Sequence, residues 1–343
     1  MWNVLGQERA VEQLKCALAA RSLGHAYLLV GPAHVGKMAL ALALARAVNC
    51  ESADAPCGVC PQCQRIAAGL HPDVAIVTVL SAEESEDGRT KTEIGVKQVE
   101  ELQRSASLSP FEGKCKVFII APAERLSAAA ANRLLKTLEE PEPRVLFILL
   151  AEAAGALPET VRSRCQCLDL GLVPAEVIEK TLLEGGLPME SVQVLSRICR
   201  GRPGWALAAA KDGSLLSERT ERLKTLLSLM RGDYEERFNY AGELSARYGR
   251  YQEAVHEVLE LWLAVWRDLL LLKLGCADAI TGVDALDELT RLAAGFSLDE
   301  IKGAAGSVSL ASEQLDKNAN PRLVLEVLML NLPRAEGAVV ENG

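Results

Sequence analysis

The sequence has few aromatic residues, no excess of basic charge and no long apolar run, and each shortage excludes some classes of protein. Phe, Trp and Tyr together make up only 4% of the 343 residues. The apolar residues, 49% overall, are mostly Ala, Leu and Val. Because Ala and Leu favour helices, we expect a chain that is largely helical.

Basic residues do not outnumber acidic ones. Lys and Arg number 37 against 46 Asp and Glu, which gives a formal net charge of -9 at pH 7. A protein that binds DNA on its own needs a basic face that releases counterions from the phosphates. The charge therefore argues against autonomous DNA binding, although not against a role beside DNA within a larger assembly.

Long apolar segments are also missing. Charged residues interrupt the apolar stretches within about ten residues, whereas a membrane-spanning helix needs about 20. Residues 1–20 carry Glu8, Glu12 and Lys15, unlike the apolar core of a secretory signal. We therefore expect a cytoplasmic protein without a membrane partner.

The length of 343 residues allows two or three domains. Short apolar runs that predict buried strands end near residue 170, and helical patterns follow from Pro174 onward. The most apolar helical run, 258–274, is typical of the central helix of a bundle or of an oligomer interface. The strands are expected at 26–30, 74–80, 116–120, 144–150 and 166–170, and an acidic loop at 81–91.

The stretch from Gly31 to Met38 has the layout of a phosphate-binding loop between a strand and a helix. Gly31 and Gly36 would let backbone N–H groups turn toward phosphate oxygens, and Lys37 would add a point charge. A P-loop that hydrolyses nucleotide carries Ser or Thr after the lysine to hold Mg²⁺, but Met38 stands here. The loop could bind ATP or ADP without turnover, or it could be retained only because it folds well.

A second part of the catalytic machinery is missing after the strand expected at 116–120. In P-loop ATPases an Asp-Glu pair supports Mg²⁺ and polarises the attacking water at this place. Here the two positions hold Ala121 and Pro122, and neither side chain can do this work. We therefore expect no hydrolysis by this chain alone.

Four of the ten cysteines have the spacing of metal ligands. Cys50, Cys57, Cys60 and Cys63 follow the pattern C-x6-C-x2-C-x2-C. Four thiolates satisfy a tetrahedral Zn²⁺ and leave no open position, so we predict a structural zinc site. The alternative is a set of free or transiently oxidised thiols. A zinc-dependent nucleic-acid-binding module is disfavoured, because few basic residues and no interleaved aromatic residues lie nearby.

Several motifs together resemble the clamp-loader ATPase family of bacterial DNA polymerase III. The resemblance covers residues 1–210 by specific motifs and residues 211–335 only by their helical pattern. The motifs are His25-Ala-Tyr-Leu, the four-cysteine insertion after the P-loop helix, His71-Pro-Asp, the run from Ala129 to Pro141 and Arg162-Ser-Arg-Cys-Gln166.

The resemblance implies an α/β P-loop AAA+ module, which is a five-stranded parallel sheet with helices on both faces. A small helical lid domain and an all-α collar domain follow, and we place these parts at 1–170, 171–212 and 213–335, with a tail at 336–343. The family's collar joins gamma/tau and delta subunits in a hetero-pentameric ring. That ring uses ATP to load a sliding clamp onto primer-template DNA, so contacts with clamp and DNA would come through the assembly.

The departures from the family pattern indicate the type of subunit. Gamma/tau motor subunits keep a P-loop Thr, the Asp-Glu pair, a polar residue after strand four and a lid arginine. The chain is instead similar to the non-catalytic delta-prime (stator) subunits. The alternative is a gamma/tau-like subunit that binds or hydrolyses ATP. At the places of the motor subunits' Thr, Asp-Glu pair, polar residue after strand four and lid arginine, this chain has, respectively, Met38, Ala121-Pro122, Ala151-Glu152 and Gly204-Trp205.

The motif Ser163-Arg164-Cys165 is intact. From its position alone, Arg164 is typical of a surface arginine between a loop and a strand. In the family this arginine is a finger that reaches the γ-phosphate on a neighbouring subunit, where a planar, permanently charged guanidinium stabilises the transferred phosphoryl group. The resemblance therefore implies that Arg164 acts in trans and that the chain has no catalytic residue acting in cis.

Overall fold

The computed structural model describes residues 2–80, 93–248, 251–317 and 319–335. The loop expected at 81–91 and the tail expected at 336–343 lie outside these residues. Within them, every helix is too short or too polar to span a membrane. The chain forms two compact units, Met1–Thr181 with Gly201–Trp205 and Leu182–Arg200 with Ala206–Gly343.

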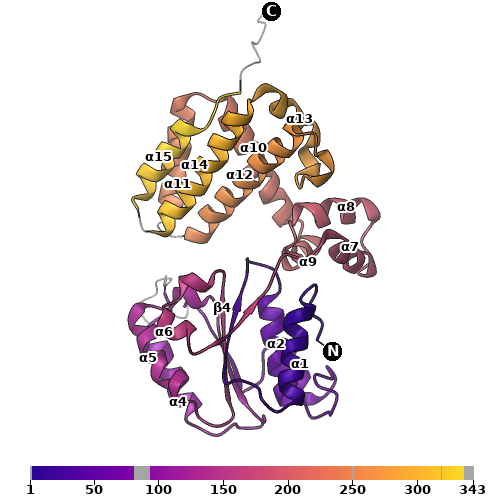
Figure 1. Ribbon diagram of the computed structural model, residues 1–343, viewed down its shortest axis with the longest axis vertical. Coiled ribbons are helices and arrows are strands. Elements are labelled where there is room, and N and C mark those ends of the chain that lie inside the picture. The colour runs from indigo at the N-terminus through magenta and orange to yellow at the C-terminus, as the bar shows by residue number, and fades with distance from the viewer. Residues whose placement is uncertain (1, 81–92, 249–250, 318, 336–343) are drawn as a thin grey trace, which may run out of the picture. The chain divides into compact units, whose positions relative to one another are not determined.

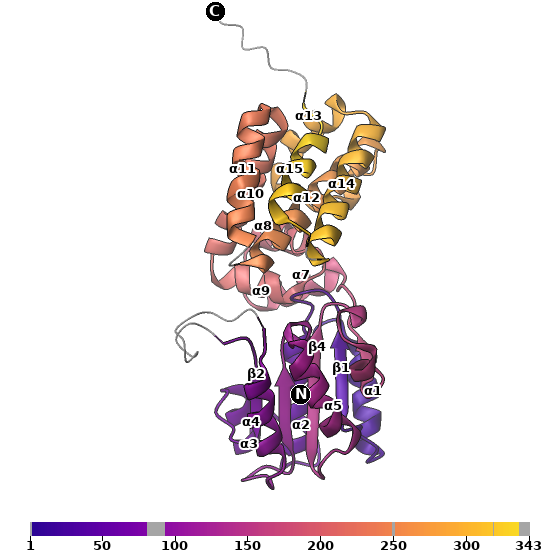
Figure 2. The same ribbon diagram turned by 90° about the vertical axis from the view of Figure 1, so that its left-hand side faces the viewer.

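A five-stranded parallel sheet lies at the centre of the first unit (Figure 1 and Figure 2). Its strand order is β2-β3-β4-β1-β5. Strands β1, β3 and β4 are buried along their whole length, which explains why their sequences are continuous apolar runs and do not alternate. The strands are β1 (Ala26–Val30), β2 (Val74–Val77), β3 (Lys116–Ile120), β4 (Val145–Ala151) and β5 (Gln166–Asp169).

Helices cover both faces of the sheet (Figure 1). Alternate residues of β1 serve the two layers, since Leu29 packs with the helices on one face and Leu28 with those on the other. The expected α/β P-loop fold with helices on both faces is therefore confirmed. One layer contains α1 (Glu8–Ala19), α2 (Lys37–Asn49) and α3 (Pro61–Ala67), and the other contains α4 (Val96–Ala106), α5 (Ala128–Glu139) and α6 (Glu159–Arg162).

Three short helices follow the sheet in the segment expected to form the lid. They are α7 (Ala175–Glu184), α8 (Met189–Ile198) and α9 (Pro203–Lys211). The division between the two compact units passes through this segment, at residues 181–182, 200–201 and 205–206. The domain limits given above for the lid and the collar therefore remain predictions.

The second unit contains a helical bundle built around α12 (Gln252–Lys273). Trp262 and Trp266 of this helix are fully buried and belong to the bundle core. Of the two alternatives for the apolar run 258–274, the structure shows the central helix of a bundle. The surrounding helices are α10 (Ser214–Arg231), α11 (Tyr234–Tyr248), α13 (Leu286–Gly295), α14 (Leu298–Asp316) and α15 (Pro321–Asn331).

A buried arginine ties two helix ends of the bundle together. Arg237 on α11 is only 2% exposed, and its guanidinium donates to the carbonyl oxygens of Leu229 at 2.9 Å, Leu332 at 2.6 Å and Pro333 at 3.1 Å. These carbonyls lie at the C-terminal ends of α10 and α15, where backbone acceptors lack helical partners and the helix dipole favours a cation. Burial lowers the pKa of Arg237, whereas the carbonyls at the two helix ends favour its charged form.

Replacing Arg237 with Met should destabilise the bundle by at least about 3 kcal/mol, because each buried acceptor left without a donor costs about 1–3 kcal/mol. Urea unfolding of the full chain measures the change. The control is Arg231→Met, which removes the exposed ion pair with Glu288 and should cost less than about 1 kcal/mol. Equal losses from the two variants would contradict the role given to Arg237.

Candidate functional site

The P-loop connects β1 to α2, and its two glycines are required by the backbone itself. Gly36 precedes α2 in the left-handed region with φ 109°, which residues with a Cβ rarely adopt. At Gly31 a Cβ would lie 2.3 Å from the carbonyl oxygen of Leu170. The loop therefore needs both glycines whether or not it binds a phosphate.

Lys37 is turned back onto its own loop. Its Nζ donates to the carbonyl oxygen of Pro32 at 3.0 Å and also to that of Gly31. Burial lowers the pKa of Lys37, while the nearby carboxylates of Glu152 and Glu124 act against this change. A phosphate at this loop would meet an ammonium group with two of its three N–H donors already engaged.

Two carboxylates lie near Lys37, and the sequence motifs point to the position of Glu152 but not to Glu124. Glu124 lies in the 3-10 turn η1 (Ala123–Arg125) after β3, and Glu152 follows β4. The backbone N–H of Glu152 donates to the Glu124 carboxylate at 3.2 Å. Their proximity follows from the pairing of β3 with β4, since parallel strands end at the same edge of a sheet.

Apolar packing fills the positions where a working ATPase carries its Mg²⁺ ligands. Met38 and Ala121 pack against the core between the sheet and the layer of α1 and α2. Neither side chain offers an oxygen to a metal ion or to water. The structure thus brings Gly31, Gly36 and Lys37 together in one loop, with Met38 and Ala121 in apolar packing beside it.

Backbone contacts also hold the P-loop from outside. The Gln7 side chain donates to the carbonyl oxygen of Val35 at 3.3 Å, and the backbone N–H of Gly204 donates to that of His34 at 2.9 Å. A Cβ at Gly204 would lie 2.9 Å from the same His34 oxygen. Gly204, one of the two residues at the place expected for a lid arginine, therefore has no room for a side chain in this conformation.

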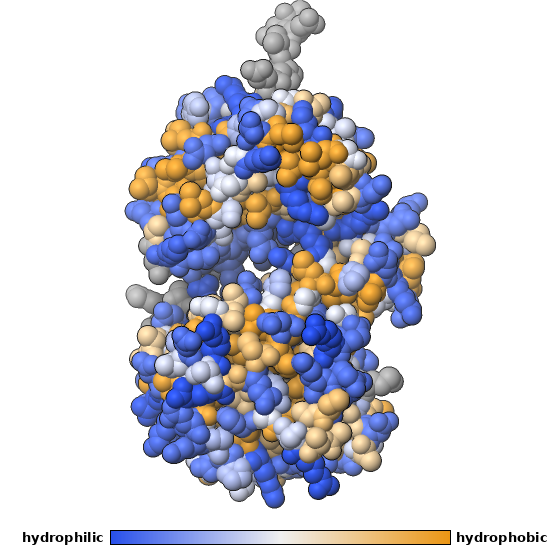
Figure 3. Space-filling view, viewed as in Figure 1, coloured by the Kyte–Doolittle hydropathy of each residue, from blue (hydrophilic) through white to orange (hydrophobic). Residues whose placement is uncertain are grey.

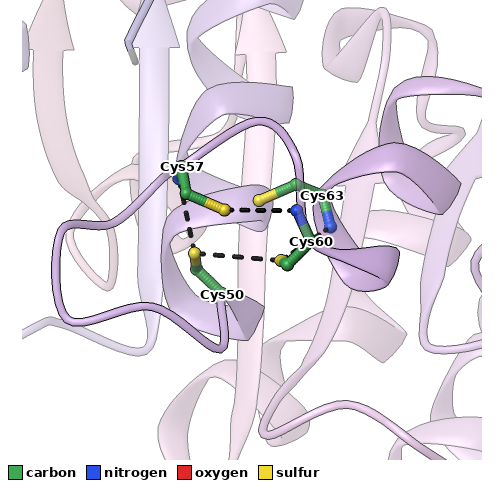
Figure 4. A group of neighbouring side chains, drawn as sticks. All are labelled: Cys50, Cys57, Cys60 and Cys63. Atoms are coloured by element: carbon green, nitrogen blue, oxygen red, sulfur yellow. Dashed lines mark hydrogen bonds between the residues drawn. The ribbon is translucent and has the colours of Figure 1, made fainter.

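The four cysteines of the predicted zinc site converge (Figure 4). Cys60 caps α3, Cys63 lies in its first turn, and all four sulfur atoms lie within 4.8 Å of one another. The backbone N–H groups of Cys57, Cys60 and Cys63 donate to the sulfurs of Cys50, Cys57 and Cys60 at 3.4, 3.3 and 3.5 Å. Such N–H donors stabilise thiolates, so the four residues could hold a metal ion such as Zn²⁺.

The thiols of this cluster differ in pKa. Hydrogen bonds from the backbone N–H groups of Val59 and Cys60 lower the pKa of Cys57 to about 6. Burial raises the pKa of Cys63 to about 12. A bound cation would remove this difference, because every thiol that coordinates a metal is deprotonated.

The His71-Pro-Asp motif organises a loop beside the cysteines. Asp73 is 4% exposed and accepts the backbone N–H groups of Phe111 at 2.7 Å, Glu112 at 2.9 Å and Gly113 at 2.8 Å. Burial acts to raise the pKa of Asp73, but these three bonds together outweigh burial and hold the pKa below its usual value. His71 in turn accepts the backbone N–H of Asp73, so the motif is structural.

Arg164 follows α6, which covers the face of the sheet opposite to α2 (Figure 1). One guanidinium nitrogen donates to the carbonyl oxygen of Thr160 at 2.7 Å and to the hydroxyl of Ser163 at 3.3 Å. The other forms an ion pair with Glu139 at the end of α5. The adjacent Cys165 packs against the core of this layer, and burial raises its pKa to about 12.

Two family models together match most of the chain. The model described as "DNA polymerase III, delta subunit" matches residues 6–173, and the model of the C-terminal part of that subunit matches residues 215–334. The chain belongs to the DNA polymerase III delta subunit family. The resemblance to the clamp-loader family, inferred from sequence motifs, is thereby confirmed.

Relatives of this family member include several polymerase III subunits. The delta' subunit of Bacillus subtilis is 27% identical over 329 residues, which cover 95% of this chain and 96% of the relative. The delta' subunit of Haemophilus influenzae is 34% identical over 192 residues, which cover 55% of this chain and 56% of the relative. The tau subunit of B. subtilis is 35% identical over 51% of this chain, but the match spans only 30% of tau.

Metal analysis of the purified chain should find about one zinc per chain. Replacing Cys60 with Ser should release this zinc and loosen the loop over 50–63, because three thiolates leave the tetrahedral site incomplete. The control is Cys16→Ser, since Cys16 is exposed and lies outside the cluster. Wild-type protein without zinc, or a Cys60→Ser variant that keeps it, would contradict the assignment.

Replacing Asp73 with Asn should destabilise the first unit by about 1–3 kcal/mol at pH 7, because an amide cannot accept all three N–H groups. The folded-state pKa of Asp73 is lowered, so its contribution is complete above the unfolded-state pKa of about 3.9 and is lost as the pH falls through the folded-state pKa. Below about pH 4 the wild type and variant should therefore converge in stability.

Urea unfolding at pH 7 and below pH 4 measures this convergence. Asp169→Asn, a change at an exposed residue of the same unit, is the control and should have little effect at either pH. A difference between wild type and Asp73→Asn that stays constant with pH would contradict the role of the charged carboxylate.

Proposed function

We propose that this chain is the non-catalytic delta-prime (stator) subunit of a DNA polymerase III clamp loader and that Arg164 completes the ATP site of a neighbouring subunit. In this role it joins gamma/tau and delta subunits in a hetero-pentameric ring that loads the sliding clamp onto primer-template DNA during replication. One observation carries the proposal. In a chain of this family, the P-loop lacks every Mg²⁺ ligand while Ser163-Arg164-Cys165 is intact.

The geometry of the P-loop supports a role without hydrolysis. Met38 and Ala121 are part of the apolar packing, and the Lys37 ammonium is already bonded to two carbonyls of the loop. The glycines meet steric needs of the fold, so their retention does not require a nucleotide. We expect ATP or ADP at this loop to share or compete for the donors of the Lys37 ammonium and not to be turned over.

The placement of Arg164 supports action in trans. The charged groups that act on Lys37 are Glu152, Glu124 and Arg202, whereas Arg164 follows a helix on the opposite face of the sheet. Its side chain is 32% exposed. An accessible guanidinium that is not among the charged groups acting on Lys37 suits contact with a phosphate on another molecule.

The second unit supports assembly into a ring. Its apolar central helix is buried in the bundle, so the contacts with other subunits must use outer surfaces. On α15 the exposed residues Leu323, Val327 and Leu330 follow one another at helical spacing, and apolar side chains gather over this helix in Figure 3. This stripe suits contact with another subunit of the assembly.

The zinc that we propose at Cys50, Cys57, Cys60 and Cys63 would have a structural role. A closed four-thiolate site has no open position for substrate or water. It would fasten the loop between α2 and α3, a segment that also carries the hydrogen bond from Lys114 to the Cys50 carbonyl. No step of the proposed function passes through this ion.

A second candidate is a gamma/tau-like subunit that binds or hydrolyses ATP. The retained Gly31, Gly36 and Lys37 favour it, as does the gamma/tau subunit of Mycobacterium tuberculosis, which is 27% identical over 98% of this chain. The two candidates differ in one measurable property. Only the second predicts Mg²⁺-dependent ATP turnover by the purified chain.

The proposal is tested by the ATPase activity of a reconstituted clamp loader. The chain alone should show no turnover, and Arg164→Ala should slow the DNA- and clamp-stimulated turnover of the complex. An arginine finger contributes about 10³–10⁵-fold at the site it serves, although the other ATP sites of the ring would continue to work. Arg162→Ala is the matched control, because Arg162 lies two residues away and pairs with Glu159 at the surface.

Two results would overturn the proposal. Turnover by the chain alone would show that the P-loop is a working site and would favour the gamma/tau-like candidate. A complex carrying Arg164→Ala that hydrolyses ATP as fast as the wild type would remove the trans-acting role.

A further inference from the structure

The guanidinium of Arg164 is held against the surface of its own chain. One of its nitrogens donates to the carbonyl oxygen of Thr160 and the hydroxyl of Ser163, and another pairs with the Glu139 carboxylate. The Nε–H is buried and has no hydrogen-bond partner among the described residues. The side chain is therefore folded back and does not extend toward a partner.

Glu139 comes from a motif that the proposed function does not otherwise use. It is the last residue of α5, whose Leu134 and Leu138 are buried in the core between this helix and the sheet. Helices α5 and α6 pack against each other, which places the carboxylate beside the arginine 25 residues away in sequence. The Glu139 side chain is 49% exposed, so it is free to separate from Arg164.

We propose that Glu139 is a positioning residue that holds Arg164 in this withdrawn conformation, and that the triphosphate on a neighbouring subunit must displace the carboxylate. The inference rests on the proposed trans-acting function of Arg164. A carboxylate and a phosphate both bind the planar fork of a guanidinium through paired N–H donors. The two anions therefore compete for the same face of Arg164.

The half-exposed position of the pair limits the size of this competition. Exposed ion pairs shift an equilibrium by about 1.5- to 5-fold, which corresponds to about 0.2–1 kcal/mol. The competition acts before the arginine reaches the phosphate, so it should raise the ATP concentration needed for turnover. Once the phosphate has displaced Glu139, the rate of the chemical step should not depend on it.

The test is an ATP titration of the reconstituted clamp loader containing wild-type chain or Glu139→Gln. The glutamine keeps the size and a hydrogen-bond acceptor but removes the charge. We expect the KM for ATP to fall about 2–5-fold with kcat unchanged, and the difference to shrink at high salt because screening weakens the pair. Glu140→Gln, the same charge change at the next, exposed residue, should leave both constants unchanged.

The same titration with Arg164→Ala separates this inference from the proposed function. Because Glu139 acts through Arg164, adding Glu139→Gln to Arg164→Ala should have no further effect. If Arg164→Ala slows turnover while Glu139→Gln leaves KM unchanged or raises it, the inference is wrong and the proposed function stands. If Arg164→Ala has no effect, the proposed function itself is wrong, and the inference with it.

Discussion

The position of β1 between β4 and β5 is the constraint on which the first unit depends. Every residue of β1 is buried, and its parallel register fixes where the chain leaves the sheet. At that edge the backbone N–H of Gly31 donates a hydrogen bond to the carbonyl oxygen of Ala151, and the N–H of Leu170 donates one to the carbonyl oxygen of Val30. These bonds bring the P-loop, the end of β4 and the exit from β5 to one place. The close approach that excludes a Cβ at Gly31 follows directly from them.

This constraint explains why the P-loop keeps its glycines whether or not it binds a phosphate. The glycines stay because the backbone has no room for other residues, and Lys37 bonds to carbonyls that the tight turn leaves exposed. Met38, the residue after Lys37, packs against the apolar core. Arg164 follows α6, which belongs to the layer of α4, α5 and α6 on the face of the sheet opposite to α2.

Sequence patterns predicted the elements better than the contacts between them. The continuous apolar runs at 26–30 and 116–120 became β1 and β3 with the same limits, whereas β2 ends at Val77, before the limit of 80 expected from its apolar run. The convergence of the cysteines was predictable because the ligand spacing is local. The pairs Glu124 with Glu152 and Glu139 with Arg164 were not, since they depend on strand order and helix packing across 25 or more residues.

The carbonyls that surround Arg237 have a consequence for how the bundle comes apart. They belong to the first and the last helix of the bundle, so the cation is compensated only when both ends of this part of the chain are in place. If α15 frayed from the bundle, the guanidinium would lose the Leu332 and Pro333 carbonyls and keep only acceptors at the end of α10, such as Leu229. The C-terminal helix is therefore thermodynamically coupled to α10, and we expect the bundle to lose its structure in one cooperative transition.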